Sequence, residues 1–395
     1  MKYLFAAMFC IVFFACSDDG GGVVFLQESS SSKELSAGSV SSSSVTGQDF
    51  SRAHYVNNLL GRGMNFGNSF DAACRRGGFC NTYEEALLEP ENGSGTWDGC
   101  WSNPIRQNYF DIIKAAGFKS VRLPVRWAEK ASDVPPFEIP ASFTESVKKV
   151  VDWSIEAGLP IVINIHHYNE LYDDERCRTD LALQREKFVE LWRQIAETFK
   201  DYSNDSLVFE VLNEPRTRIT SLILNNMLEE VWPVIRETNP NRTIMINSTD
   251  WGKYSKLPEI NIPGGDMNVI LSGHYYNPHS FTHQGENGAA TGVNWGTDRE
   301  KVVLKGEIEE TYQRIKQKWP GINGTTIALN IGEFGVTNRA NINERATWVA
   351  LLRSEIEERG MSWHYWSFPR AGAYDSYTNN AWIPQILNAL IPVEN

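Results

Sequence analysis

The fold is decided by two apolar stretches, Leu207-Val-Phe-Glu-Val-Leu-Asn-Glu-Pro215 and Thr326-Ile-Ala-Leu-Asn-Ile-Gly-Glu-Phe-Gly335. Each has the length and apolar content of a strand in a parallel sheet that is covered on both faces. Each also ends on a carboxylate, Glu214 in the first and Glu333 in the second. Because burying an unpaired charge is costly, both side chains need a partner or a purpose.

Further apolar stretches of the same kind alternate with amphipathic segments. The strands are predicted at 61–67, 120–127, 161–168, 207–214, 243–249, 269–276, 326–333 and 362–368. The helices are predicted at 104–116, 143–157, 179–199, 221–238, 298–318 and 342–359, with a short closing segment near 382–390. Strand–helix alternation predicts a parallel sheet, and eight strands in one domain favour a closed (β/α)8 TIM barrel of the α/β class over an open sheet.

The N-terminal region does not belong to this domain. Residues 1–16 have the pattern of a signal peptide, because the apolar run from Tyr3 to Ala15 is too short to span a bilayer. Cys16 is placed as the acylated cysteine of a bacterial lipoprotein, and a simply secreted protein is the alternative. Residues 17–50 form a Ser/Gly-rich linker, and residues 51–395 form the barrel domain. The chain is therefore expected to be exported, as a cell-surface or outer-membrane lipoprotein or as a secreted protein.

Composition excludes some classes of partner. A net charge of −12 argues against nucleic acid, whose phosphates demand a basic face. Exposed members of the 13 tryptophans would be natural stacking surfaces for sugar rings. The spacing of the cysteines fits no zinc site, and no cofactor or metal is predicted. In an oxidising compartment Cys74, Cys80, Cys100 and Cys177 allow up to two disulfides in three connectivities. We expect a monomer.

Polar residues follow the apolar part of most predicted strands. They are Arg122, His166, His167, Asn213, Glu214, His274, Tyr276, Glu333 and Trp366. In a barrel the C-terminal ends of the strands build the active site. Strand periodicity puts Glu210 on the same face as Glu214. It also puts Glu333 on the face of Ile327, Leu329 and Ile331, which points inward if those aliphatic side chains do.

Two carboxyl groups on different strands fit acid-assisted cleavage of a glycosidic bond. Glu333 is the predicted nucleophile, because Arg122 within reach would lower its pKa. Glu214 lacks an adjacent cation in the sequence and is the predicted acid. Asn213 could bind the sugar 2-hydroxyl, Tyr276 could hold the nucleophile, and Trp366 could support the sugar next to the cleavage point.

From about Arg62 to Phe368 the chain resembles glycoside hydrolase family 5, a large cellulase family of retaining (β/α)8 enzymes. The resemblance is carried by Gly63-Met-Asn-Phe-Gly-Asn68, Val121-Arg-Leu-Pro-Val-Arg-Trp127, His166-His167, Asn213-Glu-Pro215, His274-Tyr-Tyr276, Ile331-Gly-Glu-Phe-Gly335 and Trp366. It implies Glu214 as acid/base and Glu333 as nucleophile. It implies a supporting set of Arg122, His166, Asn213, His274, Tyr276 and Trp366, and a substrate contact for His167.

The expected substrate is a β-glucan. Phe281-Thr-His-Gln284 is similar to the sixth loop of family endo-β-1,4-glucanases, whereas the longer loop between Asp71 and Gly99 departs from the family pattern. A β-mannanase, xyloglucanase or lichenase with the same machinery is the alternative. From another class, the rival is a glycan-binding surface lipoprotein that does not cleave. A metal-dependent hydrolase is disfavoured, because the adjacent His166 and His167 would point to opposite faces of a strand.

Overall fold

The structure is a computed structural model that describes residues 47–72, 103–172 and 179–392. The chain divides into Met1–Ser44 and Val45–Asn395, and every described residue belongs to the second part. The predicted signal peptide, Cys16, the four further cysteines and most of the predicted linker lie outside the described residues. Within the described ranges, no helix has the length and apolar character needed to cross a bilayer.

A closed barrel of parallel strands forms the centre of the domain, in the order β1 to β8 around the ring. The strands are β1 Arg62–Asn65, β2 Ser120–Leu123, β3 Ile161–Asn164, β4 Leu207–Glu210, β5 Ile244–Asn247, β6 Val269–His274, β7 Ala328–Phe334 and β8 Ser362–Tyr365. The predicted (β/α)8 fold is therefore confirmed. Most strands are shorter than predicted because their last residues leave the ladder to form the loops that carry the polar side chains.

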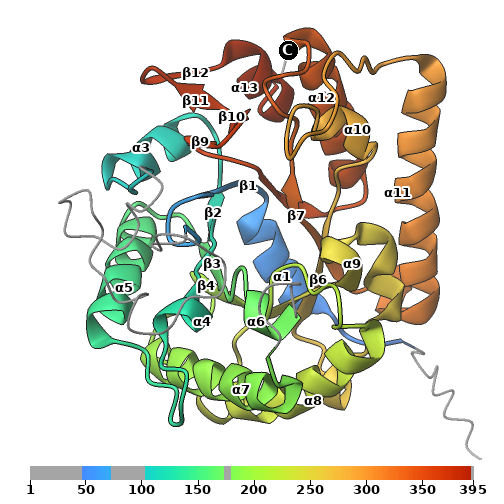
Figure 1. The fold of residues 1–395 in the computed structure, drawn as a ribbon. Helices are drawn as coiled ribbons and strands as arrows, with labels where there is room; N and C mark the ends of the chain where they lie inside the picture. Colours follow the sequence, from blue (N-terminus) through green and yellow to red (C-terminus); the bar gives the residue numbers. More distant parts are fainter. Residues whose placement is uncertain (1–46, 73–102, 173–178, 393–395) are drawn as a thin grey trace, which may run out of the picture. The chain divides into compact units, whose positions relative to one another are not determined.

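Helices surround the barrel (Figure 1). Those in the six predicted helical segments are α3 Asn108–Ala115, α5 Ala141–Glu156, α7 Leu181–Thr198, α8 Ser221–Thr238, α11 Asp298–Lys318 and α12 Ile342–Glu358. The others are α1 Ser51–Leu60, α4 Trp127–Lys130, α6 Asn169–Tyr172, α9 Thr249–Gly252, α10 His279–Thr282 and α13 Pro384–Leu390, which corresponds to the short closing segment. The connection between β5 and β6, where no long helix was predicted, contains the 3-10 helix Tyr254–Glu259.

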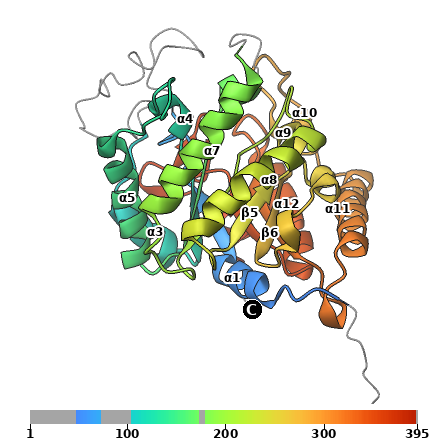
Figure 2. The same cartoon turned by 90° about the horizontal axis from the view of Figure 1, so that it is seen from below.

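One end of the barrel is closed by α1, which the sequence reasoning did not predict. Ala53, Val56 and Leu60 of α1 form one buried cluster with inward side chains of the strands, Val162, Val208, Met245, Ile270 and Ala328. Figure 2 shows α1 below the strands, with α9 and α10 toward the other end. Just before α1, Phe50 is buried and Gln48 pairs with Gly321. The folded part therefore begins a few residues before the predicted boundary at Ser51.

A bulge in β7 changes which residues point into the barrel. Ala328 belongs to the cluster inside the barrel, whereas Ile327, Leu329 and Ile331 belong to the larger core that includes the helices. The prediction that these aliphatic side chains face inward together with Glu333 is therefore wrong. Ile331 pairs with Gly273, but the next pair joins Glu333 to His274, so one extra residue intervenes. The shift turns Glu333 inward, a common use of bulges beside functional sites.

Gly332→Ala should disturb this bulge. A Cβ at position 332 would lie 2.6 Å from Ser272 Oγ and 3.2 Å from His274 Nε2, both inside the barrel. We expect the free energy of unfolding to fall by about 1–3 kcal/mol in urea denaturation. The control is Gly306→Ala on the exposed face of α11, where a Cβ meets nothing within 4 Å and helix propensity favours alanine. Equal stability of the two variants would contradict a tightly packed bulge.

Candidate active site

Arg122 on β2 is the centre of the polar network at the C-terminal end of the barrel. Its guanidinium is fully buried and uses all five of its N–H donors. Nε and Nη2 donate to the two oxygens of Glu210 at 2.6 and 3.1 Å. Nη1 donates to Asn65 Oδ1 and Glu333 Oε1, each at 2.8 Å, and Nη2 to Asn213 Oδ1 at 2.6 Å. Burial alone would lower the pKa of Arg122, but Glu210 and Glu333 outweigh it and raise that pKa.

Glu333 is held at both carboxylate oxygens. Oε1 accepts from Arg122, and Oε2 accepts from the Tyr276 hydroxyl at 3.2 Å. His274 Nδ1 lies 3.6 Å from the same Oε2. The side chain is 6 % exposed, and these contacts hold the carboxyl group in one orientation.

Glu214 is held more loosely. It follows β4 with φ of 46°, a left-handed conformation that a residue with a side chain rarely adopts. Its Oε1 bonds to His274 Nδ1 at 2.9 Å, and its side chain is 18 % exposed. One carboxylate oxygen of Glu214, one of Glu333 and a ring nitrogen of His274 all lie within 4.8 Å of one another. The predicted pair of carboxyl groups therefore faces one small space.

His274 stands between the two carboxyl groups. Its Nε2 lies 3.0 Å from the amide nitrogen of Asn247, which also donates to Glu210 at 3.2 Å. This contact favours a ring proton on Nδ1, directed at Glu214. Burial would lower the pKa of His274, but the charges of Glu333 and Glu214 outweigh it and raise that pKa.

The two carboxyl groups differ in their affinity for a proton. Burial favours the protonated form of Glu214, yet the hydrogen bond and charge of His274 prevail and lower its pKa. Burial raises the pKa of Glu333, the charge of Glu214 raises it further, and His274 and Arg122 only partly offset this. The expected ion pair of Arg122 with Glu333 is present and acts to lower the pKa of Glu333, but burial and the neighbouring carboxylate outweigh it.

The remaining predicted site residues lie on the same end of the barrel. Asn213 Nδ2 is 3.4 Å from His166 Nε2, and burial lowers the pKa of His166 well below its usual value. Trp366 is half-buried and lies parallel to the His166 ring at a centroid distance of 6.1 Å. The indole also packs against Gly67, two residues after β1, because a Cβ at Gly67 would be 2.7 Å from it.

His167 lies against His166 and beside the first loop. The two ring centroids are 4.2 Å apart, so the expectation that these side chains would point to opposite faces of a strand is wrong. The φ of His167 is 55°, and its Nε2 lies 3.8 Å from Asp71 Oδ2. Burial raises the pKa of Asp71 to about 6, although the hydrogen bonds from the backbone amides of Asn68 and Ser69 act to lower it. Asp71, His166 and His167 bring three potential ligand atoms within 4.8 Å of one another. Since Asp71 already accepts from those two amides at 3.0 and 2.8 Å, its oxygens are committed to the loop.

Sequence reasoning missed several buried residues that orient the site. Asn65 and Asn247 contact Arg122 and His274 directly, and Asn164 donates to Glu210 at 3.1 Å and lies 3.3 Å from His166 Nδ1. Each is the last residue of its strand, so position at the strand end was the available signal. Glu210 was predicted to face inward one layer below Glu214, and it does so as the bidentate partner of Arg122.

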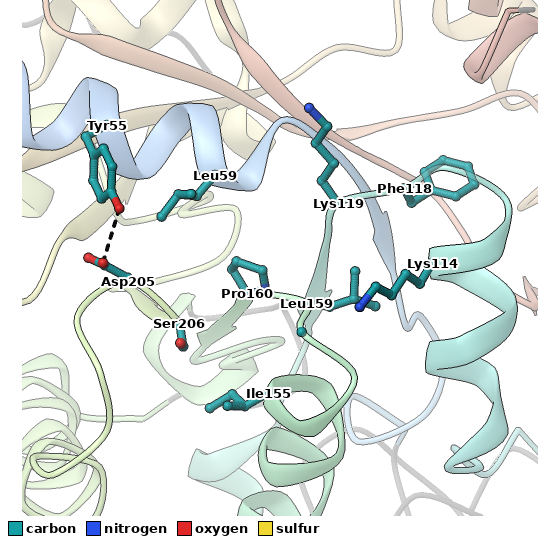
Figure 3. Close-up of a pocket in the computed structure, with 11 residues that line it drawn as sticks. Tyr55, Leu59, Lys114, Phe118, Lys119, Ile155, Leu159, Pro160, Asp205 and Ser206 are labelled. Atoms are coloured by element: carbon teal, nitrogen blue, oxygen red, sulfur yellow. Dashed lines mark hydrogen bonds between the residues drawn. The ribbon is translucent and has the colours of Figure 1, made fainter.

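A cavity of about 480 Å³ lies elsewhere, at the end of the barrel where the strands begin (Figure 3). Tyr55 and Leu59 of α1 line one side, and Pro160 and Ser206, which precede β3 and β4, line another. The Tyr55 hydroxyl donates to Asp205 at 3.3 Å. This cavity is distant from Glu214 and Glu333 along the barrel axis, and it contains none of the predicted site residues.

Comparison with known proteins supports the reading of the site. Residues 84–372 match the model of the family described as Cellulase (glycosyl hydrolase family 5). The chain is 34% identical to Endoglucanase H of Acetivibrio thermocellus, over 71% of this chain and 29% of that protein. It is similar to structures of Thermotoga maritima Cel5A with cellobiose and with mannotriose, at 34% and 33% identity. Each superposition has a TM-score of 0.73 and covers 86% of this chain and 100% of that one.

The curated relatives extend well beyond the matched region. The chain spans 29% of the length of Endoglucanase H and 37% of Cellulase/esterase CelE, both from Acetivibrio thermocellus. The similarity therefore concerns the barrel that carries the site.

Glu210→Gln tests the buried ion pair beneath the carboxyl groups. Removing one partner leaves Arg122 with less compensation, so we expect a loss of about 3 kcal/mol in unfolding free energy near neutral pH. Because Arg122 holds the pKa of Glu210 below its ordinary value, against the effect of burial, this contribution exists above that ordinary value. It disappears as the pH falls through the lowered pKa, where the wild type also carries a neutral side chain.

Urea denaturation at about pH 7, 5 and 3.5 measures the difference between the wild type and Glu210→Gln. Glu197→Gln, which removes an exposed pair with Lys200, is the control and should change stability little at every pH. If the difference in unfolding free energy between the wild type and Glu210→Gln grew toward low pH, the assigned ion pair of Arg122 and Glu210 would be contradicted.

Proposed function

Because the chain belongs to glycosyl hydrolase family 5, we propose that it hydrolyses internal β-1,4-glucosidic bonds with retention of configuration. One observation carries this proposal: carboxylate oxygens of Glu214 and Glu333 lie within 4.8 Å of each other. Retaining enzymes place their carboxyl groups about 5 to 5.5 Å apart, whereas inverting enzymes leave about 6.5 to 9.5 Å for a water molecule. The close spacing supports a direct attack by one of the two carboxylates.

Glu333 suits the nucleophile because it is held still. Arg122 and Tyr276 fix its two oxygens, so little reorganisation is needed before it attacks the anomeric carbon. In the first step a carboxylate oxygen forms the bond to that carbon while the bond to the leaving oxygen breaks. Glu214 supplies the proton to that oxygen, and the leaving chain departs as an alcohol.

Glu214 suits the acid/base because it is the more accessible group and has one hydrogen-bonding partner, His274, among the residues the structure describes. When Glu333 becomes an ester it loses its negative charge. The repulsion that raised the pKa of Glu214 is then removed, and Glu214 gives up its proton more readily. Glu214 can then take a proton from water, whose oxygen attacks the anomeric carbon and releases Glu333. The group that donates a proton in the first step thus becomes the base of the second.

In the substrate-free protein burial and the charge of Glu214 raise the pKa of Glu333, and the hydrogen bond from His274 lowers that of Glu214. The first step requires the proton on Glu214. A sugar ring that binds against Glu333 displaces water and separates the Glu333 carboxylate from Glu214. His274 already contacts Glu214. We propose that the shared proton moves to Glu214 through His274 as the substrate binds, since these groups titrate together.

The proposed substrate is cellulose or a mixed-linkage β-glucan. The similarity to proteins named endoglucanases supports this choice. A β-mannanase is the second candidate, because the related Thermotoga maritima Cel5A is described in complex with mannotriose as well as cellobiose. No metal or cofactor is assigned a role in either reaction.

Variants at the two carboxyl groups should separate their roles. Glu333→Gln should lower turnover on β-glucan about 10³-fold or more, and it should also abolish cleavage of β-cellobiosyl fluoride. Glu214→Gln should lower β-glucan turnover similarly. It should still release an initial burst of fluoride, because that leaving group needs no proton. Glu197→Gln is the control with normal turnover. Substantial β-glucan hydrolysis by either active-site variant, with folding intact, would overturn the mechanism.

Product analysis tests both the stereochemistry and the substrate class. On cellulose oligomers the first product seen by proton NMR should be the β-anomer, before mutarotation. Among barley β-glucan, carboxymethyl cellulose, xyloglucan and glucomannan, the β-glucans should be cleaved fastest. An initial α-anomer would refute retention, and a strong preference for glucomannan would favour the mannanase. Absence of turnover on every β-glycan would favour a glycan-binding protein that does not cleave.

A further inference from the structure

The short helix α10 carries two histidines one helical turn apart. His279 is its first residue and His283 directly follows its last. The His283 N–H donates to the His279 carbonyl at 2.9 Å, as in an α-helix. The two rings lie nearly parallel, with a centroid distance of 3.8 Å and an interplanar angle of 13°. Histidines at this spacing share one face of a helix, where both can bind the same metal ion.

The tautomer of His283 is fixed by Thr282. The Thr282 hydroxyl has a single hydrogen, which it donates to the Tyr276 carbonyl at 2.5 Å. Its contact of 2.9 Å with His283 Nδ1 therefore requires a proton on that nitrogen. Nε2 of His283 is then left with a free lone pair. A metal-binding histidine has this arrangement, in which one ring nitrogen donates a hydrogen bond and the other binds the ion.

Both rings are open to a further ligand. In the part of the chain that the structure describes, neither nitrogen of His279 nor Nε2 of His283 has a hydrogen-bonding partner. His279 is exposed and His283 is half-buried, so the pair is accessible from solvent. Two nitrogens bound at about 2.1 Å to one tetrahedral ion lie about 3.4 Å apart. The rings are already close to that separation, so small side-chain rotations bring both nitrogens to one ion.

The backbone that carries the pair is held in place by the barrel. Phe281, between the two histidines, is fully buried and stacks on Trp295 at a centroid distance of 5.9 Å. The Thr282 carbonyl accepts from the Tyr374 hydroxyl at 3.2 Å and from the Thr337 N–H at 3.0 Å. Because the turn is already ordered, binding an ion costs little additional conformational entropy.

Two other groups of potential ligands occur among the described residues, one around Asp71 and one formed by Glu214, His274 and Glu333. Both oxygens of Asp71 accept backbone N–H groups, at 3.0 and 2.8 Å. His274 Nδ1 is bonded to Glu214, and both oxygens of Glu333 accept hydrogen bonds. An ion would have to break such contacts at either group, whereas the two histidines of α10 give up none.

We infer that His279 and His283 form a binding site for a divalent transition-metal ion such as Ni²⁺, Cu²⁺ or Zn²⁺, with water in the remaining positions. Imidazole nitrogen suits these ions, whereas Ca²⁺ and Mg²⁺ prefer oxygen. The His283 ring packs edge-on against Tyr276 at a centroid distance of 4.8 Å, and Tyr276 donates to Glu333. The metal site therefore lies beside the candidate active site without using either of its carboxyl groups as a ligand.

Isothermal titration calorimetry of the protein without an affinity tag measures the binding of Ni²⁺ alone. The wild type is compared with His279→Gln, His283→Gln and the control His54→Gln. His54 lies on α1 at the other end of the barrel, where its Nε2 is 2.8 Å from the Thr326 carbonyl. Each change in the pair should weaken Ni²⁺ binding at least about tenfold, because one of two protein ligands is lost. His54→Gln should bind Ni²⁺ like the wild type, and excess Ca²⁺ should not compete.

The Cu²⁺ complex gives a second measurement. Its EPR spectrum should show coupling to the imidazole nitrogens of both histidines in the wild type and of a single histidine in His279→Gln. Cu²⁺ should also bind more tightly than Ni²⁺. Neither measurement depends on turnover, so a failure of the proposed hydrolysis would leave both results unchanged.

Equal Ni²⁺ affinity of the wild type and His279→Gln would place the ion elsewhere and overturn the inference. The same conclusion would follow if the wild type bound no Ni²⁺, or if Ca²⁺ displaced Ni²⁺ from the protein.

Discussion

The buried guanidinium of Arg122 is the interaction on which the site depends. Its five hydrogen bonds link Asn65 on β1, Glu210 on β4, the Asn213 amide and the Glu333 carboxylate. A cation without access to water is tolerable here because two carboxylates and two amide oxygens replace its hydration. Side chains from strands far apart in the sequence are thereby fixed in one arrangement. Such rigidity is what electrostatic stabilisation of a transition state requires, because the dipoles are oriented before the reaction starts.

Much of the architecture could be read from the sequence, since it follows from local patterns. Each strand was marked by an apolar run, and the amphipathic period placed α8 and α11 at their observed bounds. The sequence could group the candidate site residues because polar groups at the C-terminal ends of the strands of a parallel barrel converge. The inward direction of Glu333 was reached by a wrong argument. It depends on a single extra residue in β7, which alternation along one strand cannot reveal.

The proton affinities of the two glutamates show a second limit of sequence reasoning. A cation near Glu333 was correctly expected, but a pKa depends on every charge and on burial around the group. His274 lowers the pKa of Glu214, and the charge of Glu214 raises the pKa of Glu333. Asn65, Asn164 and Asn247 escaped notice for a related reason. Their value lies in partners on neighbouring strands, and a single asparagine at a strand end carries no distinctive local pattern.

The helix α1 separates the entry of the described chain from the candidate active site. The described chain enters beside Gly321, at the end of the barrel that α1 closes, while Glu214 and Glu333 lie at the other end. Substitutions in residues 47–60 are therefore separated from the two carboxyl groups by the length of the barrel. Changes at that end can alter stability without touching the side chains that hold Glu214 and Glu333.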